Sequence, residues 1–160
     1  MDDRDLRTSV RIQTAPFDAQ AEADALRAGD LDVGAVVTFV GTVRDLNEGE
    51  AVSTLELEHY PGMTEKALRS IVDEARARFD VRGCAVVHRV GVLSPGDPIV
   101  LVAVTSAHRG DAFDACRFVM DYLKTRAPLW KKERTPHGER WVEARIVDDE
   151  AAGRWSAPAT

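Results

Sequence analysis

Cysteines are scarce and hydrophobic runs are short in this chain, and each absence excludes a class of protein. Cys84 and Cys116 are the only two cysteines in 160 residues, and they lie 32 positions apart in apolar surroundings. This spacing offers no C-x-x-C motif and no secreted context, so we expect two reduced, buried thiols and no disulfide. No apolar run approaches the roughly 18 residues that a membrane span needs.

The N-terminus and the histidines exclude further classes. Asp2, Asp3 and Asp5 precede no apolar stretch like that of a secretory signal, so we expect a cytoplasmic protein with no membrane partner. The four histidines form no H-x-x-x-H motif and no mixed Cys/His cluster. We therefore expect no bound metal and no cofactor.

The basic residues are unevenly distributed along an acidic chain. The net charge is −6 and aromatic residues make up only 6% of the sequence, which argues against a protein that binds nucleic acid. Between residues 124 and 145, however, seven basic residues stand against three acidic ones, giving +4 there and −10 elsewhere. This asymmetry predicts one localised anion-binding site.

Hydrophobic periodicity and turn residues predict a single domain spanning residues 1–160, with residues 1–30 and 148–160 peripheral. Strands are predicted at 10–13, 34–44, 52–60, 84–90, 99–105 and 140–147. Helices are predicted from Asp18 to Gly29, from Thr64 to Phe79 and over 111–125. Because strands and helices interleave irregularly, we expect an α+β fold with a mixed or antiparallel sheet.

Several details of this arrangement can be tested against a structure. Residues 34–44 are apolar enough for a well-buried strand, which we expect to pair with 52–60, and 84–90 should form a hairpin with 99–105. Residues 127–138 have the composition of a loop, and the residues after 147 that of a mobile tail. Phe118 and Tyr122 lie off the core stripe of their helix, where we expect them in a surface for a partner protein, in a strip for self-association or under the N-terminal helix.

Three segments carry polar groups that a packed core does not need. Arg44 ends a strand, and His108 and Arg109 precede a helix, where backbone N–H groups favour an anion. Lys124 lies near a helix end, and Lys131 follows an apolar Pro-Leu-Trp run that could desolvate it. Each residue also has a structural interpretation, as a solvated strand end, a helix cap or a favourable cation at a helix C-terminus.

Longer segments carry a family resemblance. The runs TLELEHYPGMTEKAL, GDPIVLVAVTSAHR and FVMDYLKTRAPLWKKE, followed by GERWVEAR, resemble the large, catalytic subunit of molybdopterin synthase. The resemblance extends from about residue 34 to residue 145. It implies an α/β hammerhead fold and a sulfurtransferase of molybdenum cofactor biosynthesis, which converts cyclic pyranopterin monophosphate to molybdopterin by forming the dithiolene.

The resemblance also implies partners and site residues. The partners are a second copy of this subunit and a small ubiquitin-like sulfur carrier, together a heterotetramer, with the carrier's C-terminal Gly-Gly thiocarboxylate supplying both sulfurs. Lys124 and Lys131 match the family's catalytic lysines. The matched substrate-binding positions are Thr42, Val43, Arg44, His108, Arg109, Lys132, Glu133 and Arg145. Cys84 and Cys116 would then be bystanders.

Two other functions remain open at this point. The first is a binding module for a nucleotide or pterin phosphate, or an assembly scaffold, which would bind without turnover. Retention of both lysines argues against it, since anion binding could use arginines alone. The second is a small RNA-binding α+β domain, which would need exposed aromatic residues on its strands beside a basic face.

Overall fold

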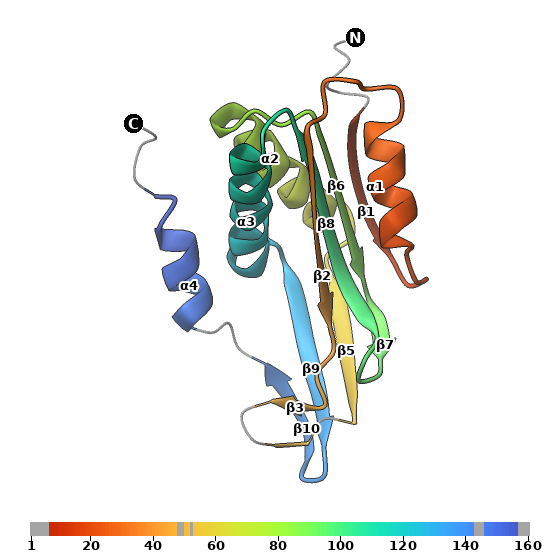
Figure 1. Cartoon of the computed structure of the whole chain (residues 1–160). Helices are drawn as coiled ribbons and strands as arrows, with labels where there is room; N and C mark the ends of the chain where they lie inside the picture. Colours follow the sequence, from red (N-terminus) through yellow and green to blue (C-terminus); the bar gives the residue numbers. More distant parts are fainter. Residues whose placement is uncertain (1–6, 48–49, 52, 143–145, 157–160) are drawn as a thin grey trace.

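The computed structural model describes residues 7–47, 50–51, 53–142 and 146–156, and places them in two sheets with flanking helices (Figure 1). The first sheet has the strand order β1-β6-β8-β2 and the second the order β10-β9-β5-β7, while β3 and β4 form a separate pair. The strands are β1 (Thr8–Gln13), β2 (Ala35–Thr42), β3 (Leu46–Asn47), β4 (Glu50–Ala51), β5 (Thr54–His59), β6 (Gly83–Arg89), β7 (Gly91–Leu93), β8 (Pro98–Ser106), β9 (Leu129–Thr135) and β10 (Gly138–Val142). The helices are α1 (Ala19–Arg27), α2 (Met63–Arg78), α3 (Arg109–Arg126) and α4 (Ile146–Gly153).

The first sheet is mixed, because β1 runs parallel to β6 while β6, β8 and β2 are antiparallel to their neighbours. The α+β class with a mixed sheet is thus confirmed. Alternate residues along β6 and β8 face two separate hydrophobic clusters. Helices α2 and α3 cover one face of this sheet, and α1 covers the other (Figure 1). The sheet positions residues for the site on the α3 face.

Local sequence signals explain where the helices begin. The Asp18 carboxylate accepts the Ala21 N–H at 3.0 Å and caps α1, as predicted. Helix α2 starts at Met63, one residue earlier than the predicted Thr64, after Gly62 at φ 84°, a conformation that favours glycine. Thr64 lies inside the helix, where its hydroxyl donates to the Pro128 carbonyl at 3.0 Å.

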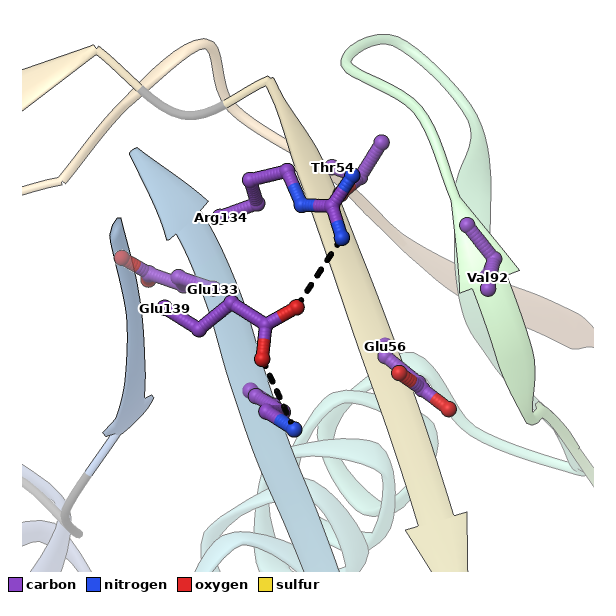
Figure 2. Close-up of a pocket in the computed structure, with 7 residues that line it drawn as sticks. Thr54, Glu56, Val92, Glu133, Arg134 and Glu139 are labelled. Carbon is purple, nitrogen blue, oxygen red and sulfur yellow. Dashed lines mark hydrogen bonds and ion pairs between the residues drawn. The ribbon is translucent and has the colours of Figure 1, made fainter. Parts of the chain in front are cut away.

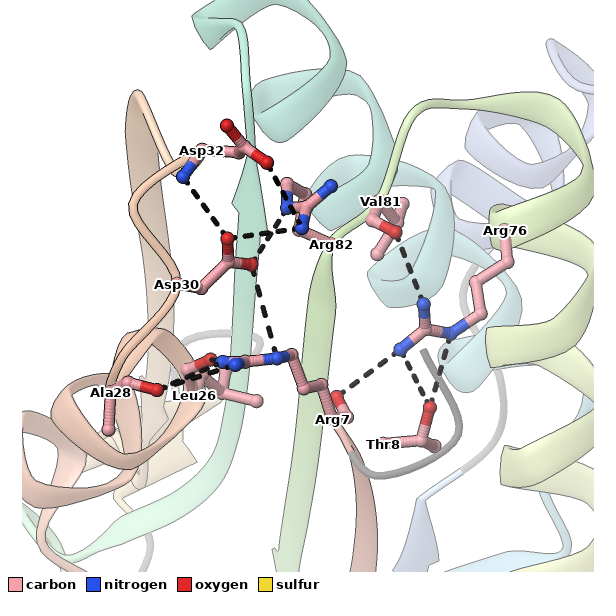
Figure 3. Close-up of polar contacts among 9 residues, drawn as sticks. All are labelled: Arg7, Thr8, Leu26, Ala28, Asp30, Asp32, Arg76, Val81 and Arg82. Carbon is pink, nitrogen blue, oxygen red and sulfur yellow. Dashed lines mark hydrogen bonds and ion pairs between the residues drawn. The ribbon is translucent and has the colours of Figure 1, made fainter. Parts of the chain in front are cut away.

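Arginines tie the N-terminal elements to the rest of the fold (Figure 3). The Arg76 guanidinium donates to the Thr8 hydroxyl at 2.7 Å and to the Val81 carbonyl at 3.1 Å, which links α2 to β1. Arg82 pairs with Asp30 at 2.7 Å, and this contact lowers the pKa of the Asp30 carboxyl. These contacts hold β1 at the sheet edge opposite β2.

Strand β2 forms the other edge of the first sheet among the described residues, which corrects its predicted burial and pairing. It pairs only with β8, and β5 pairs with β7 and β9, so the expected pairing of 34–44 with 52–60 is wrong. Val36, Phe39 and Val40 are each about 40% exposed. A β-branched run thus indicated a strand correctly, but apolar composition did not distinguish a buried strand from an edge with uncovered apolar side chains.

The chain after α3 is more ordered than its composition suggests. Residues 127–138, predicted as a loop, contain the whole of β9, which pairs with β5 and β10. The predicted mobile tail after residue 147 contains most of α4 instead, beside α3, and residues 146–147, predicted as the end of a strand, begin this helix. Phe118 and Tyr122 are buried with Phe79 and Trp155, so none of the expected locations for them is correct. In both cases, long-range packing supplies the order that local composition lacks.

The predicted pairing of 84–90 with 99–105 is confirmed as β6 against β8, although β7 lies between them in the sequence and pairs with β5. Both cysteines are reduced and buried, as expected. No helix in the described part of the chain is long and apolar enough to cross a membrane.

Candidate active site

Lys124 lies in the last turn of α3 with an exposed side chain. Among the described residues this side chain has no hydrogen bond and no ion pair, whereas Arg126, two residues on, binds Glu74 at 2.7 Å. Three other cations of the segment are also paired: Lys132 and Arg134 with Glu139, and Arg140 with Glu133. Much of the basic segment is therefore neutralised locally, while Lys124 keeps its charge for another partner.

Lys131 is brought towards Lys124 by the alternation of side chains along β9. It pairs in register with Leu57, which is 2% exposed, so its side chain lies on the inner face of the second sheet. The charges of both lysines lower the pKa of His88 on β6. Two lysines that are seven positions apart in the sequence, on α3 and β9, thus act on the same buried residue.

His88 is a buried group that the sequence did not indicate as part of the site. It is 3% exposed, and its Nδ1 lies 2.8 Å from the Arg89 carbonyl oxygen. Burial, and to a smaller extent the charges of Lys124, Lys131 and His59, lower the pKa of His88 to about 4, although the hydrogen bond to the Arg89 carbonyl acts in the opposite direction. The ring is therefore neutral at pH 7. The signal available in the sequence was a polar side chain in phase with Cys84 and Val86 on an otherwise apolar strand.

Four residues that are in register form a row across the first sheet. In register, Ile12, His88, Val100 and Gly41 follow one another across β1, β6, β8 and β2. A Cβ on Gly41 would lie 2.9 Å from the Val100 side chain. Gly41 therefore keeps the end of β2 close to β8 where the strand register shifts.

Thr42, Val43 and Arg44 follow at this same end of the sheet. The Val43 N–H donates to the Asp97 carbonyl at 2.9 Å and its carbonyl accepts the Gly96 N–H at 2.7 Å, which fixes the backbone before Arg44. Val43 is buried, while Thr42 and Arg44 are exposed. Like Lys124, Arg44 has no ion pair within the described part of the chain.

Lys132 and Glu133 lie on different faces of the second sheet. Lys132 pairs in register with Glu56 and Trp141, and its Nζ lies 2.9 Å from the Glu139 carboxylate on the outer face, opposite Lys131 (Figure 2). The bond to Glu139 raises the pKa of Lys132. Glu133 is on the inner face, 5% exposed, and accepts from Arg140 at 3.0 Å. Arg145 lies outside the described residues.

His108 and Arg109 are at the opposite end of the first sheet. His108 is the N-cap of α3, and both side chains are exposed without an ion pair among the described residues. Strand β8 runs from Pro98, opposite Thr42, to Ser106, opposite Ala35. Eight residue steps of about 3.4 Å separate the two ends of β8 by roughly 27 Å, and Arg44 lies beyond one end while His108 lies beyond the other. One chain therefore does not bring all the predicted anion-binding residues together.

The two cysteines take no part in this arrangement. Burial raises the pKa of the Cys84 thiol to about 12 and that of the Cys116 thiol to about 11. A thiol is nucleophilic only as the thiolate, so neither cysteine is suited to carry sulfur at neutral pH.

Comparison with known proteins shows the family of this chain. The model of the family described as "MoaE protein" matches residues 12–126. A molybdopterin synthase catalytic subunit from Ralstonia nicotianae is 60% identical over 147 residues, which cover 92% of this chain and 84% of the relative.

Solved structures agree in fold as well as in sequence. A molybdopterin biosynthesis MoaE protein from Burkholderia ambifaria is 58% identical, with a TM-score of 0.81 and coverage of 94% of this chain and 99% of that chain. A complex of subunits 1 and 2 of molybdopterin-converting factor from Helicobacter pylori contains a chain with the same fold, with a TM-score of 0.68 at 18% identity and coverage of 86% and 91%. The chain belongs to the MoaE family of molybdopterin synthase catalytic subunits.

Proposed function

We propose that this enzyme transfers sulfur to cyclic pyranopterin monophosphate at the paired lysines, Lys124 and Lys131. The observation that carries the proposal is that the charges of both lysines act on neutral, buried His88, at the end of the sheet where Arg44 also lies. Cations at one end of the sheet suit an anionic substrate, because charge-assisted hydrogen bonds to phosphate are strong.

The sulfur arrives from outside the chain in this proposal. The terminal thiocarboxylate of a small carrier subunit attacks an oxygen-bearing substrate carbon, and the C–S bond forms as the C–O bond breaks, the oxygen leaving as water or staying on the phosphate. Water then cleaves the carrier's acyl–sulfur bond, leaving sulfur on the substrate and a carboxylate on the carrier. Two such rounds form the dithiolene. Lys124 activates the substrate carbon and stabilises the carrier-linked intermediate, and Lys131 moves a proton or supports the developing charge.

The remaining anion-binding residues come from a second copy of the chain. Strand β2 is an uncovered edge, and a groove of about 610 Å³ runs between it and α3. Phe39 and Phe113 line this groove, and Phe113 is 61% exposed. Uncovered apolar residues beside unpaired strand N–H and C=O groups favour pairing with another chain.

The position of the groove also suits a two-fold symmetry axis that relates two copies of the chain. It contains Thr38 and Phe39, the midpoint of β2, together with Arg117, the midpoint of α3. An isologous interface places each midpoint against its own counterpart. Two α3 helices would then run antiparallel, with Arg117 of each copy near Asp114 and Asp121 of the other.

This symmetry would complete the site. Antiparallel pairing of two β2 strands about their midpoints sets Thr42 of one copy opposite Ala35 of the other. Because Ala35 lies beside Ser106, His108 and Arg109 of the second copy would approach Arg44 and Lys124 of the first. Each dimer would contain two such sites, and one carrier at each would give a heterotetramer.

Activity is tested by mixing the purified chain with thiocarboxylated carrier and cyclic pyranopterin monophosphate and measuring molybdopterin. Product formation is expected. Binding of both partners without product, using a carrier shown to be charged, would contradict the proposal and leave the binding-module function.

The shared site is tested by complementation between two inactive variants, Lys124→Ala and His108→Ala. Random reassociation gives half mixed dimers, each with one intact site, so activity should return to about a quarter of wild type. If all functional residues of a site came from one chain, the mixture would stay as inactive as its components. Mixing Lys124→Ala with Lys131→Ala is the matched control and should restore nothing, because both residues belong to the same half-site.

A further inference from the structure

We propose that Trp155 is a positioning residue of the interface between two copies of this chain, because its indole N–H holds the Asp121 carboxylate at the edge of the groove between β2 and α3. The inference rests on the two-copy arrangement of the proposed function. It deepens that arrangement by naming the group that lets two acidic surfaces meet.

The groove carries more acidic than basic residues. Its charged lining residues are Asp114, Arg117 and Asp121, all on α3. Two copies related by a two-fold axis therefore bring four carboxylates and two guanidinium groups together. Positions 114 and 121 are equally far from the midpoint of α3, so in two antiparallel helices Asp121 of one copy faces Asp114 of the other. Carboxylates that face each other in this way oppose association.

The excess charge is not compensated by an ion pair within the chain. Among the residues that the structure describes, none forms an ion pair with Asp114, Arg117 or Asp121. Arg117 precedes Asp121 by four residues on the same helix, and this order of charges favours an ion pair less than the reverse order. Arg117 is exposed and can bond to Asp114 of the second copy. One guanidinium for each Asp114 leaves Asp121 as the excess charge.

Trp155 supplies the hydrogen-bond donor for this excess charge. Its Nε1–H donates to Asp121 Oδ2 at 2.7 Å. The ring that carries the donor is fixed by edge-on contacts with Phe79 and Phe118, with centroid distances of 5.7 and 5.6 Å. The Trp155 carbonyl also accepts from Arg78 at 2.6 Å. A fixed donor stabilises the charge of a carboxylate and determines where it lies.

The position of the C-terminal segment determines the direction in which the carboxylate is held. Helices α3 and α4 lie side by side, and α4 and β2 are on opposite sides of α3 (Figure 1). Trp155 follows α4 directly, and its N–H donates to the Ala152 carbonyl at 3.1 Å. The bond from the indole therefore holds Asp121 towards α4 and away from the strand edge where the second copy pairs.

The test measures the dissociation constant of the dimer of the full chain by sedimentation equilibrium. Trp155→Phe removes the N–H donor and keeps an aromatic ring against Phe79 and Phe118. It should raise the dissociation constant about ten- to a hundred-fold, the effect of losing a hydrogen bond to a charged group. Trp141→Phe, the same change at an exposed tryptophan of β10, is the matched control and should leave the wild-type constant.

Asp121→Asn tests the same idea without any change to Trp155. The amide carries no charge, so this variant should form a dimer at least as tight as the wild type. Combined with Trp155→Phe, it should recover most of the lost affinity. An unchanged constant in Trp155→Phe, a weaker dimer in Asp121→Asn, or a double variant as weak as Trp155→Phe would overturn the proposal.

Failure of this inference can be distinguished from failure of the two-copy arrangement. A wild-type chain that stayed a monomer at all concentrations would overturn both. A wild-type dimer whose dissociation constant did not respond to Trp155→Phe would reject only the role of Trp155. Neither measurement depends on turnover, so the result stands apart from the assay for molybdopterin.

Discussion

Lys131 and Lys132 are consecutive in β9, yet their side chains lie on opposite faces of the sheet. Lys131 is in register with buried Leu57 and acts on His88, while Lys132 is in register with Glu56 and binds Glu139 at 2.9 Å. This relationship separates two lysines that the sequence presents as one basic pair. It also makes each lysine a control for the other.

Replacement of the inward lysine should cost more activity than replacement of the outward one. We expect Lys131→Ala to lower kcat by about a hundred-fold, within the range for loss of a proton-transfer group, and Lys132→Ala to lower it much less. Steady-state molybdopterin formation at saturating carrier measures both. Equal losses of kcat would mean that the basic charge of the segment determines activity and that the face of the sheet on which each lysine lies does not. Arg126→Ala, which removes a surface ion pair with Glu74, is the control for general charge loss.

A charge in the groove between β2 and α3 should separate the two copies. Phe39→Asp and Phe113→Asp each place a carboxylate among apolar residues of the proposed interface, so the mass in solution should fall to that of one chain. Activity should fall with it, because the site would lose His108 and Arg109 of the second copy. Leu31→Asp alters a residue that is 98% exposed elsewhere, and its mass should equal that of the wild type. A Phe113→Asp variant that kept the wild-type mass would place the interface on another surface.

Buried His88 should make folding stability depend on pH. Its pKa is about 4 when folded and about 6.5 when unfolded, so the unfolded chain binds more protons between these values. The contribution of His88 to the free energy of unfolding should therefore be constant above pH 6.5. It should decrease as the pH falls towards 4, by on the order of 3 kcal/mol. Urea unfolding at several pH values measures the decrease, with His88→Gln as the reference that lacks this contribution. Parallel curves for the two proteins would contradict it.

Trp155 should anchor the C-terminal segment to the helices. Its ring contacts Phe79 and Phe118 edge-on, its indole N–H donates to Asp121 at 2.7 Å, and its carbonyl accepts from Arg78 at 2.6 Å. Trp155→Ala should lower the free energy of unfolding by about 2 kcal/mol and increase amide exchange in α4. Trp141→Ala, at a tryptophan that is 56% exposed, should change stability far less. Protection of α4 that survived Trp155→Ala would show that other contacts hold it.

The buried thiols should be inert. Because burial raises the pKa of Cys84 to about 12 and that of Cys116 to about 11, a thiol reagent at pH 8 should modify neither in the native protein and both after unfolding. Cys116→Ala should retain sulfur transfer, measured with charged carrier. Loss of transfer in a folded Cys116→Ala protein would place the sulfur on this chain after all.

Local signals in the sequence were sufficient for much of the fold. The Asp18 cap, the apolar stripe of α2 and the β-branched runs of β6 and β8 are short-range features, and the structure has these elements where they were predicted. Strand β9 was missed because its residues LWKKERT have no apolar alternation of their own. Pairing with β5 on one side and β10 on the other makes it a strand, and the pairing with β5 joins residues between 70 and 80 positions apart.

What is known of the candidate site likewise comes partly from the sequence and partly from the tertiary structure. The sequence by itself determined the family, and through the resemblance it predicted the two lysines and a reaction without a catalytic thiol, because these depend on which residues follow one another. Only the tertiary structure decided that Lys131 lies on the inner face of the second sheet while Lys132 binds Glu139 on the outer face, and that Arg44 and His108 lie at opposite ends of β8. The physical reason is that strand pairing fixes the face and the end of the sheet at which a side chain lies, and pairing partners are set by contacts distant in the sequence.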